Sequence, residues 1–387
     1  MKYWRGYLVA AILAVITWAF REFAQTHSKL VDMIYPYVTR MVQNYMANWS
    51  AGTDACVWQI LIIAMAVVAV GTIVLMIIFK WNPIQWFGWI LAVASMIVLL
   101  HTGIFGMNEF AGPIAEDIRL EQADCTDEQL QAAAIYYRDK ANALAEQVSR
   151  NADGSLKVPS LAVLSEQAEN GFKNLVYENY YSVFAGTTLP VKELGMAEYF
   201  TSLGEMGHTV AITGEAAVNM EAPSVMLPFA VCREMCYRMC IASDRDKHFG
   251  AFLACQANEV PEFQYAGYVM AYRYCLNALP KEAAATIDAE ANANVRSDVD
   301  DWEVFIAPSL KMKEPGLRDK LESYLPEKFR SKEENPLIAE GQIVDLLIRW
   351  HYETEVLPSI TEPEVRFDPY DESQVDMTGL PHVKKKK

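Results

Sequence analysis

The sequence predicts a mostly α-helical membrane protein, in which N-terminal transmembrane helices precede a large helical domain with one small β element. Three observations support this fold class. Two long apolar runs contain no Asp, Glu, Lys or Arg, and each is long enough to cross a bilayer as a helix. The residues that follow show repeated helix start and stop signals. Only one short β-branched stretch, Thr209–Ile212, is typical of a strand.

Residues 57–105 contain the clearest membrane segment. Val57–Phe79 would be about 34 Å long as a helix, and Ile84–Phe105 is a second run of similar length. Both exceed the hydrocarbon core of a bilayer, which is about 30 Å thick. Only Lys80–Pro83 connects them, so we expect a transmembrane helical hairpin.

A shorter apolar run, Gly6–Phe20, follows Lys2 and Arg5. Such a run can be the hydrophobic region of a signal peptide or a first membrane span. No small-residue cleavage site follows it, because the chain continues with the sequence R-E-F-A-Q. We therefore predict that residues 1–20 form a retained transmembrane helix.

Residues 21–56 connect the first span to the hairpin. Within them, Lys29–Asn48 carries apolar residues at helical spacing. This pattern predicts an amphipathic helix that lies on the membrane or on the soluble domain.

The basic residues favour one orientation in the membrane. Lys2, Arg5 and Lys80 place the N-terminus and the hairpin tip in the cytoplasm. Residues 21–56 and all residues after 105 would then be extracytoplasmic. A weaker signal opposes this orientation, because the predicted outer segment also carries Arg21, Lys29 and Arg40.

Residues 106–356 are predicted to fold as one helical domain. A capping box at Thr126–Gln129 opens a helix that continues to about residue 150. Proline and glycine separate the further helices, which we expect at 160–177, 228–241, 244–257, 261–279, 281–305, 315–325 and 340–356. The tail, 357–387, is rich in proline and charge and is expected to wrap the surface or to be disordered.

Composition excludes some classes of function. The chain has 387 residues and a formal net charge of −16, which argues against nucleic-acid binding. Its seven cysteines include no C-x-x-C pair, so a zinc ribbon or thioredoxin motif is unsupported. Cys232, Cys236 and Cys240 recur every four residues and would share one helix face. We interpret them as small buried side chains, with a thiolate metal site as the alternative.

The segment Leu227–Tyr237 carries the main functional signal. In zinc peptidases the motif H-E-x-x-H places two histidines on one helix face to bind Zn²⁺, and the glutamate activates a metal-bound water. This chain keeps the glutamate as Glu234 but has Arg233 and Tyr237 at the histidine positions. Arginine stays protonated and offers no lone pair to a metal. The segment therefore predicts a peptidase-like helix without its metal ligands.

The surroundings of this motif resemble DUF3810, a bacterial membrane protein family of unknown function. In that family a T-G-E-A-N-V-N segment precedes L-P-F-T-x-x-H-E-x-A-H-Q, and D-E-A-N-F-x-A-x-L-A-C and Y-S-G-Y segments follow. The similar segments in this chain are Thr213–Asn219, Leu227–Phe229, Arg245–Cys255, Tyr265–Tyr268 and Asn277–Leu279. Weaker similarity extends over most of the chain, at Gly106–Asn108, Pro113–Glu116 and Val344–Leu347.

The resemblance implies a zincin-like, metallopeptidase-like fold for residues 106–356 and assigns roles by position. The family's presumed ligands fall on Arg233, Tyr237 and Asp246, and its presumed general base falls on Glu234. Only Asp246 keeps a ligating group. We therefore expect no bound zinc or other cofactor, a vestigial Glu234, and a direct Arg233–Asp246 salt bridge in place of the metal. Glu215 is expected either beside the cleft or in a surface turn.

Three functional hypotheses follow from these residues. The leading one is a membrane-anchored, catalytically inactive relative of zinc metallopeptidases that binds a protein or peptide outside the bacterial cytoplasmic membrane. The first alternative is an active zinc peptidase with a rewired metal site, using Asp246, His248, Glu234 or the cysteines. The second is a structural membrane protein whose cleft is filled. Each hypothesis has the lipid bilayer as a partner and no nucleic acid.

Overall fold

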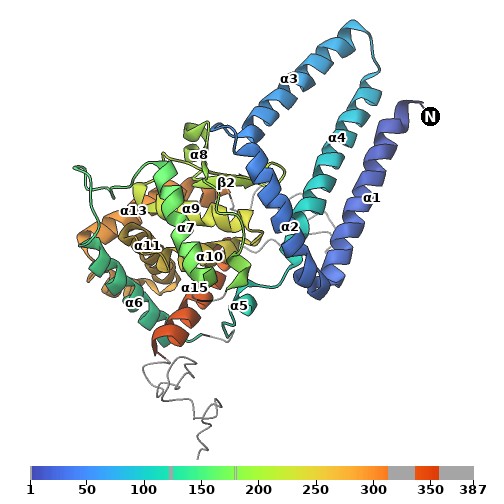
Figure 1. Cartoon of the computed structure of the whole chain (residues 1–387). Coiled ribbons are helices and arrows are strands. Elements are labelled where there is room, and N and C mark those ends of the chain that lie inside the picture. The colour runs from blue at the N-terminus through green and yellow to red at the C-terminus, as the bar shows by residue number, and fades with distance from the viewer. Residues whose placement is uncertain (1, 122–124, 178, 180, 313–335, 357–387) are drawn as a thin grey trace, which may run out of the picture.

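The computed structural model describes residues 2–121, 125–177, 179, 181–312 and 336–356. The described chain has two parts, which are an arm of long N-terminal helices and a helical domain (Figure 1). The helix predicted at 315–325 and the tail 357–387 lie outside the described residues.

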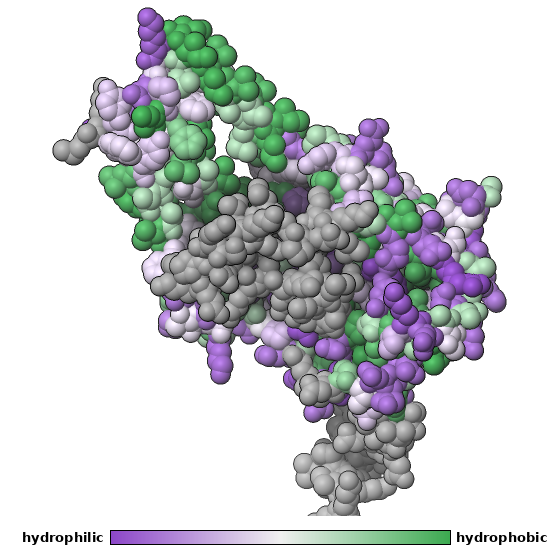
Figure 2. Space-filling model, turned by 180° about the vertical axis from the view of Figure 1, so that it is seen from behind, coloured by the Kyte–Doolittle hydropathy of each residue, from purple (hydrophilic) through white to green (hydrophobic). Residues whose placement is uncertain are grey.

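Three helices of the arm are long and apolar enough to cross a membrane. They are α1 (Arg5–Thr26, after a 3₁₀ turn at Lys2–Trp4), α3 (Val57–Ile78) and α4 (Pro83–Ile104), and we call them the anchor helices. Figure 2 shows hydrophobic residues gathered on this arm, whereas the domain surface is largely hydrophilic. The N-terminus and the α3–α4 connection lie at the same end of the arm (Figure 1), as the predicted topology requires.

Two of the anchor helices, α1 and α4, pack against each other through small residues. A Cβ atom added to Gly6 would lie only 2.4 Å from the carbonyl carbon of Gly88, so this close approach requires glycine. Helix α3 differs, because its buried residues are only Trp58 and Gln59, at its N-terminal end. The rest of its apolar surface is left for lipid.

Helix α2 (Ser28–Ser50) links α1 to α3 and lies against the domain. Its inward contacts are polar: Asp32 Oδ1 accepts from the Gly112 backbone N at 2.8 Å, and Arg40 donates to the carbonyls of Ser182 and Met239. Its large apolar side chains are exposed instead, namely Leu30, Met33, Ile34, Tyr37, Val38, Met41, Tyr45 and Trp49. The predicted amphipathic helix thus makes polar contacts with the domain and leaves its large apolar side chains exposed.

The domain packs its helices around one hydrophobic core. Its helices are α5 (Ile114–Asp117), α6 (Asp127–Ala145), α7 (Leu161–Tyr177), α8 (Ala197–Ser202), α9 (Leu227–Arg238), α10 (Asp244–Gln256), α11 (Pro261–Ala278), α12 (Lys281–Asp288), α13 (Ala293–Met312) and α15 (Pro336–His351). Short turns of 3₁₀ helix lie at Gly106–Phe110, Ser182–Phe184 and Ser224–Met226, and a π turn lies at Tyr352–Val356. The predicted capping box is present, since Thr126 accepts from the Gln129 backbone at the start of α6.

One predicted helix, 281–305, is two helices in the structure. The chain leaves helical geometry after α12, and the Asn292 side chain accepts a hydrogen bond from the Asn294 backbone N at 2.9 Å. Asparagine often starts a helix in this way, because its side chain satisfies an amide that has no helical partner.

A three-stranded sheet lies beside α9. Its order is β1 (Lys192–Glu193), β3 (Glu215–Val218), β2 (Gly207–Val210), with β1 parallel and β2 antiparallel to β3. The predicted strand Thr209–Ile212 overlaps β2 but extends two residues too far, because the chain turns back through Gly214, at φ 65°. The sequence E-A-A-V of β3 favours helix by propensity, and its complete burial overrides that preference.

Candidate functional site

Helix α9 places Glu234 against strand β2. The residue is 3% exposed. Thr209 Oγ1 donates to Glu234 Oε2 at 2.6 Å, and Arg233 Nη1 donates to Oε1 at 2.6 Å. Both oxygens of the proposed vestigial base therefore already hold a hydrogen bond.

Arg233 pairs with Glu234 and not with Asp246, so the predicted Arg233–Asp246 salt bridge is wrong. The Arg233 and Glu234 side chains are 12% and 4% exposed, so the pair is nearly removed from water. The prediction placed Asp246 on the wrong face of α10. Successive residues of a helix point about 100° apart, so a shift of one residue changes the face. Lys247, one residue further along, faces α9 instead.

Lys247 brings a second cation to this place. Its Nζ lies 2.5 Å from Asp244 Oδ1 and 5.0 Å from the centre of the Tyr237 ring. Burial and the Arg233 charge lower the pKa of Lys247, while Asp244 and Glu234 act in the opposite direction. Arg233, Glu234, Asp244 and Lys247 thus form a group of two cations and two anions, which we call the ion cluster. Sequence reasoning missed Asp244 and Lys247, although their i, i+3 spacing on a helix signals an ion pair.

Tyr237 closes the cluster on the side of the anchor helices. Its ring centre lies 4.6 Å from that of Phe105, in the segment that follows α4. Burial, with the nearby Glu109 charge, raises the pKa of Tyr237 to about 12. The phenol is therefore neutral at ordinary pH and packs as an aromatic side chain beneath the Lys247 ammonium.

This set of groups does not suit a zinc ion. Zinc in proteins is bound by thiolate, neutral imidazole or carboxylate groups. Arg233 and Lys247 are cations, and Tyr237 holds its proton. Within the described ranges, no three His, Cys, Asp or Glu side chains are grouped so that they could hold a metal ion.

His248 and the cysteines, which were considered for a rewired site, pack against hydrophobic side chains or in the core. The His248 ring stacks on Phe229 with centres 5.9 Å apart. Cys232 and Cys236 are fully buried, and burial raises the pKa of the Cys236 thiol well above its usual value. Neutral thiols in apolar surroundings behave as small hydrophobic side chains, which agrees with the first interpretation of the cysteines.

Glu215 has neither of the two places expected for it. Its side chain is fully buried and accepts hydrogen bonds from the backbone amides of Val57 and Trp58, at 2.8 and 2.9 Å. Lys192 Nζ lies 2.6 Å from the same carboxylate. Glu215 therefore caps the N-terminus of α3 and ties this anchor helix to the sheet.

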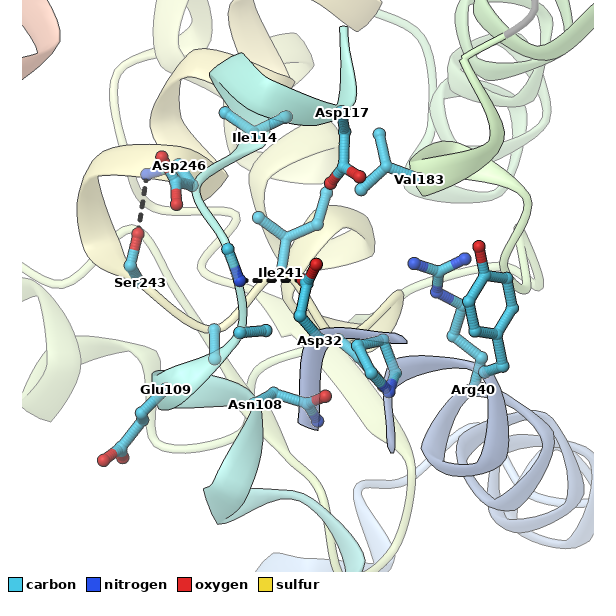
Figure 3. A pocket seen from close by; sticks show the side chains of 16 residues that line it. Asp32, Arg40, Asn108, Glu109, Ile114, Asp117, Val183, Ile241, Ser243 and Asp246 are labelled. Atoms are coloured by element: carbon cyan, nitrogen blue, oxygen red, sulfur yellow. Dashed lines mark hydrogen bonds between the residues drawn. The ribbon is translucent and has the colours of Figure 1, made fainter. Parts of the chain in front are cut away.

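Asp246 lies on the other side of α10, in a polar hollow between this helix and α2 (Figure 3). It is 8% exposed, and its Oδ1 has no hydrogen-bond partner among the residues that the structure describes. The same hollow is lined by Asp32 and Asp117. The structure thus separates Asp246 from Arg233, Glu234 and Tyr237, with which the sequence had grouped it.

The fold and this site describe a mostly helical protein that has three helices long and apolar enough to cross a membrane, and whose helix α9 carries the nearly buried Arg233–Glu234 ion pair. The chain belongs to the family described as protein of unknown function (DUF3810), whose model matches residues 31–327. The match confirms the family seen in the sequence, and it begins within α2 and includes the whole ion cluster. Searches of curated proteins and of solved structures found no significant match.

Proposed function

We propose that this protein is a membrane-anchored pseudopeptidase that binds a protein or peptide outside the cytoplasmic membrane. The ion cluster is the observation that carries the proposal. Arg233 occupies a histidine position of the zincin motif, and Lys247 adds an ammonium group beside it. Two internal cations thus balance acidic groups that a dication would otherwise balance.

Glu234 supports the loss of catalysis. A general base must be free to take a proton from a bound water. Here one oxygen of Glu234 is held by Arg233 and the other by Thr209, at 2.6 Å each. Both oxygens of the carboxylate are therefore occupied by protein donors.

Strand β2 supports a binding role. It is at the end of the sheet order, and no other strand of the described chain pairs with its outer side. His208 on this strand is exposed, and Thr209 contacts the ion cluster through Glu234. An extended peptide can add to such a free edge through backbone hydrogen bonds. The bound peptide would then run beside a site that cannot cleave it.

The catalytic part of the proposal is tested by metal analysis of the full-length protein purified without chelator. We expect no stoichiometric zinc and no chelator-sensitive peptide hydrolysis. One tightly bound zinc per chain, with hydrolysis abolished by Glu234→Gln, would instead establish the active-peptidase alternative.

The binding part is tested by placing a photocrosslinking amino acid at position 208 of the full chain in its native membrane. The matched control is position 163, because Val163 is also exposed but lies on α7, away from the sheet. We expect a discrete protein or peptide adduct at 208 and none at 163. Absence of adducts at both positions would favour the structural alternative.

The location of the domain is tested by protease treatment of intact spheroplasts. The N-terminus and the Lys80 connection lie at one end of the anchor helices, and their basic residues favour the cytoplasm (Figure 1). We expect the domain to be degraded without lysis. Protection until lysis would reverse the orientation.

A further inference from the structure

The hollow beside Asp246 is separate from the ion cluster. It lies between α2, the 3₁₀ turn Gly106–Phe110 and the start of α10, and its cavity volume is about 60 Å³. Figure 3 shows Asp32 and Asp117 directed into the same space from two elements. Tyr37 and Arg40 line it from α2, whose large apolar side chains are exposed.

Acidic side chains outnumber basic ones in the lining of this hollow. Asp32, Asp117 and Asp246 take part in no ion pair within the described part of the chain. Two arginines are nearby: the Arg40 guanidinium donates to the carbonyls of Ser182 and Met239, and the Arg245 charge acts to lower the pKa of Asp246. The other acid of the lining, Glu109, is paired with Arg21 at 3.2 Å.

Asp246 is the strongest indication of a ligand. Its backbone N donates to Ser243 Oγ at 3.0 Å, which fixes the start of α10, but its Oδ1 accepts no hydrogen bond. A carboxylate that is 92% buried, with one oxygen unpaired, is costly unless another group supplies a donor. Burial raises the pKa of Asp246, and burial together with the Asp32 charge raises that of Asp117 to about 6.

The spacing of the three acids favours an organic cation over a metal ion. Metal–oxygen bonds are short, about 2.0–2.6 Å for magnesium and calcium. These carboxylates are not grouped closely enough to share one metal ion, since the described residues contain no such set. Each N–H···O bond of an ammonium group spans about 2.8 Å, so its three donors reach acceptors that lie further apart.

We propose that this hollow binds a primary ammonium group, which Asp246, Asp117 and Asp32 hold by charge-assisted hydrogen bonds. The ligand joins the membrane-side helix α2 to α10 and to α5 of the domain. Because α2 has an exposed apolar face and lies between two candidate membrane spans, the ammonium can come from an aminophospholipid headgroup or from a soluble amine. Both sources present the same chemistry to the three carboxylates.

The test uses the full-length protein in phosphatidylcholine nanodiscs, where every lipid ammonium is quaternary and has no N–H donor. Thermal unfolding is followed by tryptophan fluorescence while ethanolammonium or putrescine is added. Tetramethylammonium and KCl at matched ionic strength are the controls for charge alone. We expect the two primary amines to raise Tm in a saturable manner and the controls not to do so.

Variants connect this response to the hollow. Asp246→Asn keeps the shape of the side chain, and we expect it to weaken amine binding roughly tenfold or more, since it removes a charged acceptor. Glu166→Gln, at an exposed carboxylate on α7, is the matched control and should bind like the wild type. Equal amine responses in wild type and Asp246→Asn would overturn the proposal, as would equal responses to tetramethylammonium.

The lipid composition separates the two sources. If the headgroup is the ligand, nanodiscs that contain phosphatidylethanolamine should stabilise the wild type and remove its response to putrescine. If the ligand is soluble, the putrescine response should persist in both kinds of nanodisc. No response to primary amines and no effect of phosphatidylethanolamine would overturn the proposal in both forms.

Discussion

The two sides of α10 contain similar acidic groups in opposite electrostatic situations. Towards α9, the acids of the ion cluster are paired with Arg233 and Lys247. Towards α2, Asp246 faces a hollow with two more aspartates, and none of the three is in an ion pair within the described part of the chain. The comparison shows that acids on one face of a helix can be paired with cations of the same protein, while on the opposite face a buried carboxylate keeps an oxygen without a partner among the described residues. Pairing of the acids with internal cations stabilises the fold. Acids without such a partner are suited to bind a cation from outside the protein.

The largest loss of stability is expected from Arg233→Met, which removes one of the two cations of the ion cluster. Glu234 would stay almost fully buried without its cation, and removing one partner of a buried pair costs about 3–5 kcal/mol. Urea unfolding of the detergent-solubilised protein measures this loss. The control Lys173→Met breaks an exposed pair with Glu169 and should cost less than about 1 kcal/mol. Similar costs for both variants would mean that the cluster is exposed to water.

The pairing itself is measured by adding Glu234→Gln to Arg233→Met. The amide keeps an acceptor for Thr209 but removes the unpaired charge. We expect the double variant to recover about 1–3 kcal/mol relative to Arg233→Met alone. A double variant whose loss equals the sum of the two single losses would show that Arg233 stabilises by packing and not by charge.

On the other side of α10, we expect a substitution to increase the free energy of unfolding instead of lowering it. Asp246→Asn removes a buried charge that lacks a partner, so in amine-free phosphatidylcholine nanodiscs it should raise the free energy of unfolding by about 1 kcal/mol. The exposed replacement Glu166→Gln should leave stability within about 0.5 kcal/mol. A destabilised Asp246→Asn would indicate that the carboxylate already has a partner.

The smallest expected effect is a pH dependence of the stability that arises from Asp117. Its pKa is raised from 3.8 to about 6, first by burial and then by the Asp32 charge, with Arg40 acting against the rise. Between these values the folded state binds the proton more tightly than the unfolded state does. This stabilisation is therefore present at low pH and is lost as the pH rises from about 4 to about 6.

The variant Asp117→Asn should lack this loss of stability between about pH 4 and pH 6. The difference between wild-type and variant stability, measured by urea unfolding at each pH, isolates it from the other titrating groups. A difference that does not change with pH between about 4 and 6 would contradict the raised pKa of Asp117.

Sequence patterns with a fixed period determined much of the fold. The apolar runs identified the spans because a bilayer sets the length of a crossing helix. The capping box at Thr126 and the amphipathic pattern of Lys29–Asn48 gave helices where they occur. In the site, the sequence by itself identified Arg233, Glu234 and Tyr237, since these positions are defined by spacing within one helix.

Only the tertiary structure decided which groups from different helices meet. Asp246 was matched to the correct helix but assigned the wrong face, because a single-residue step on α10 exchanges it for Lys247. Glu215 contacts the start of α3 across more than 150 residues of chain, at Val57. The hollow likewise combines Asp32 with residues more than 80 positions away. Such contacts depend on how helices are oriented and packed, and local periodicity carries no information about that.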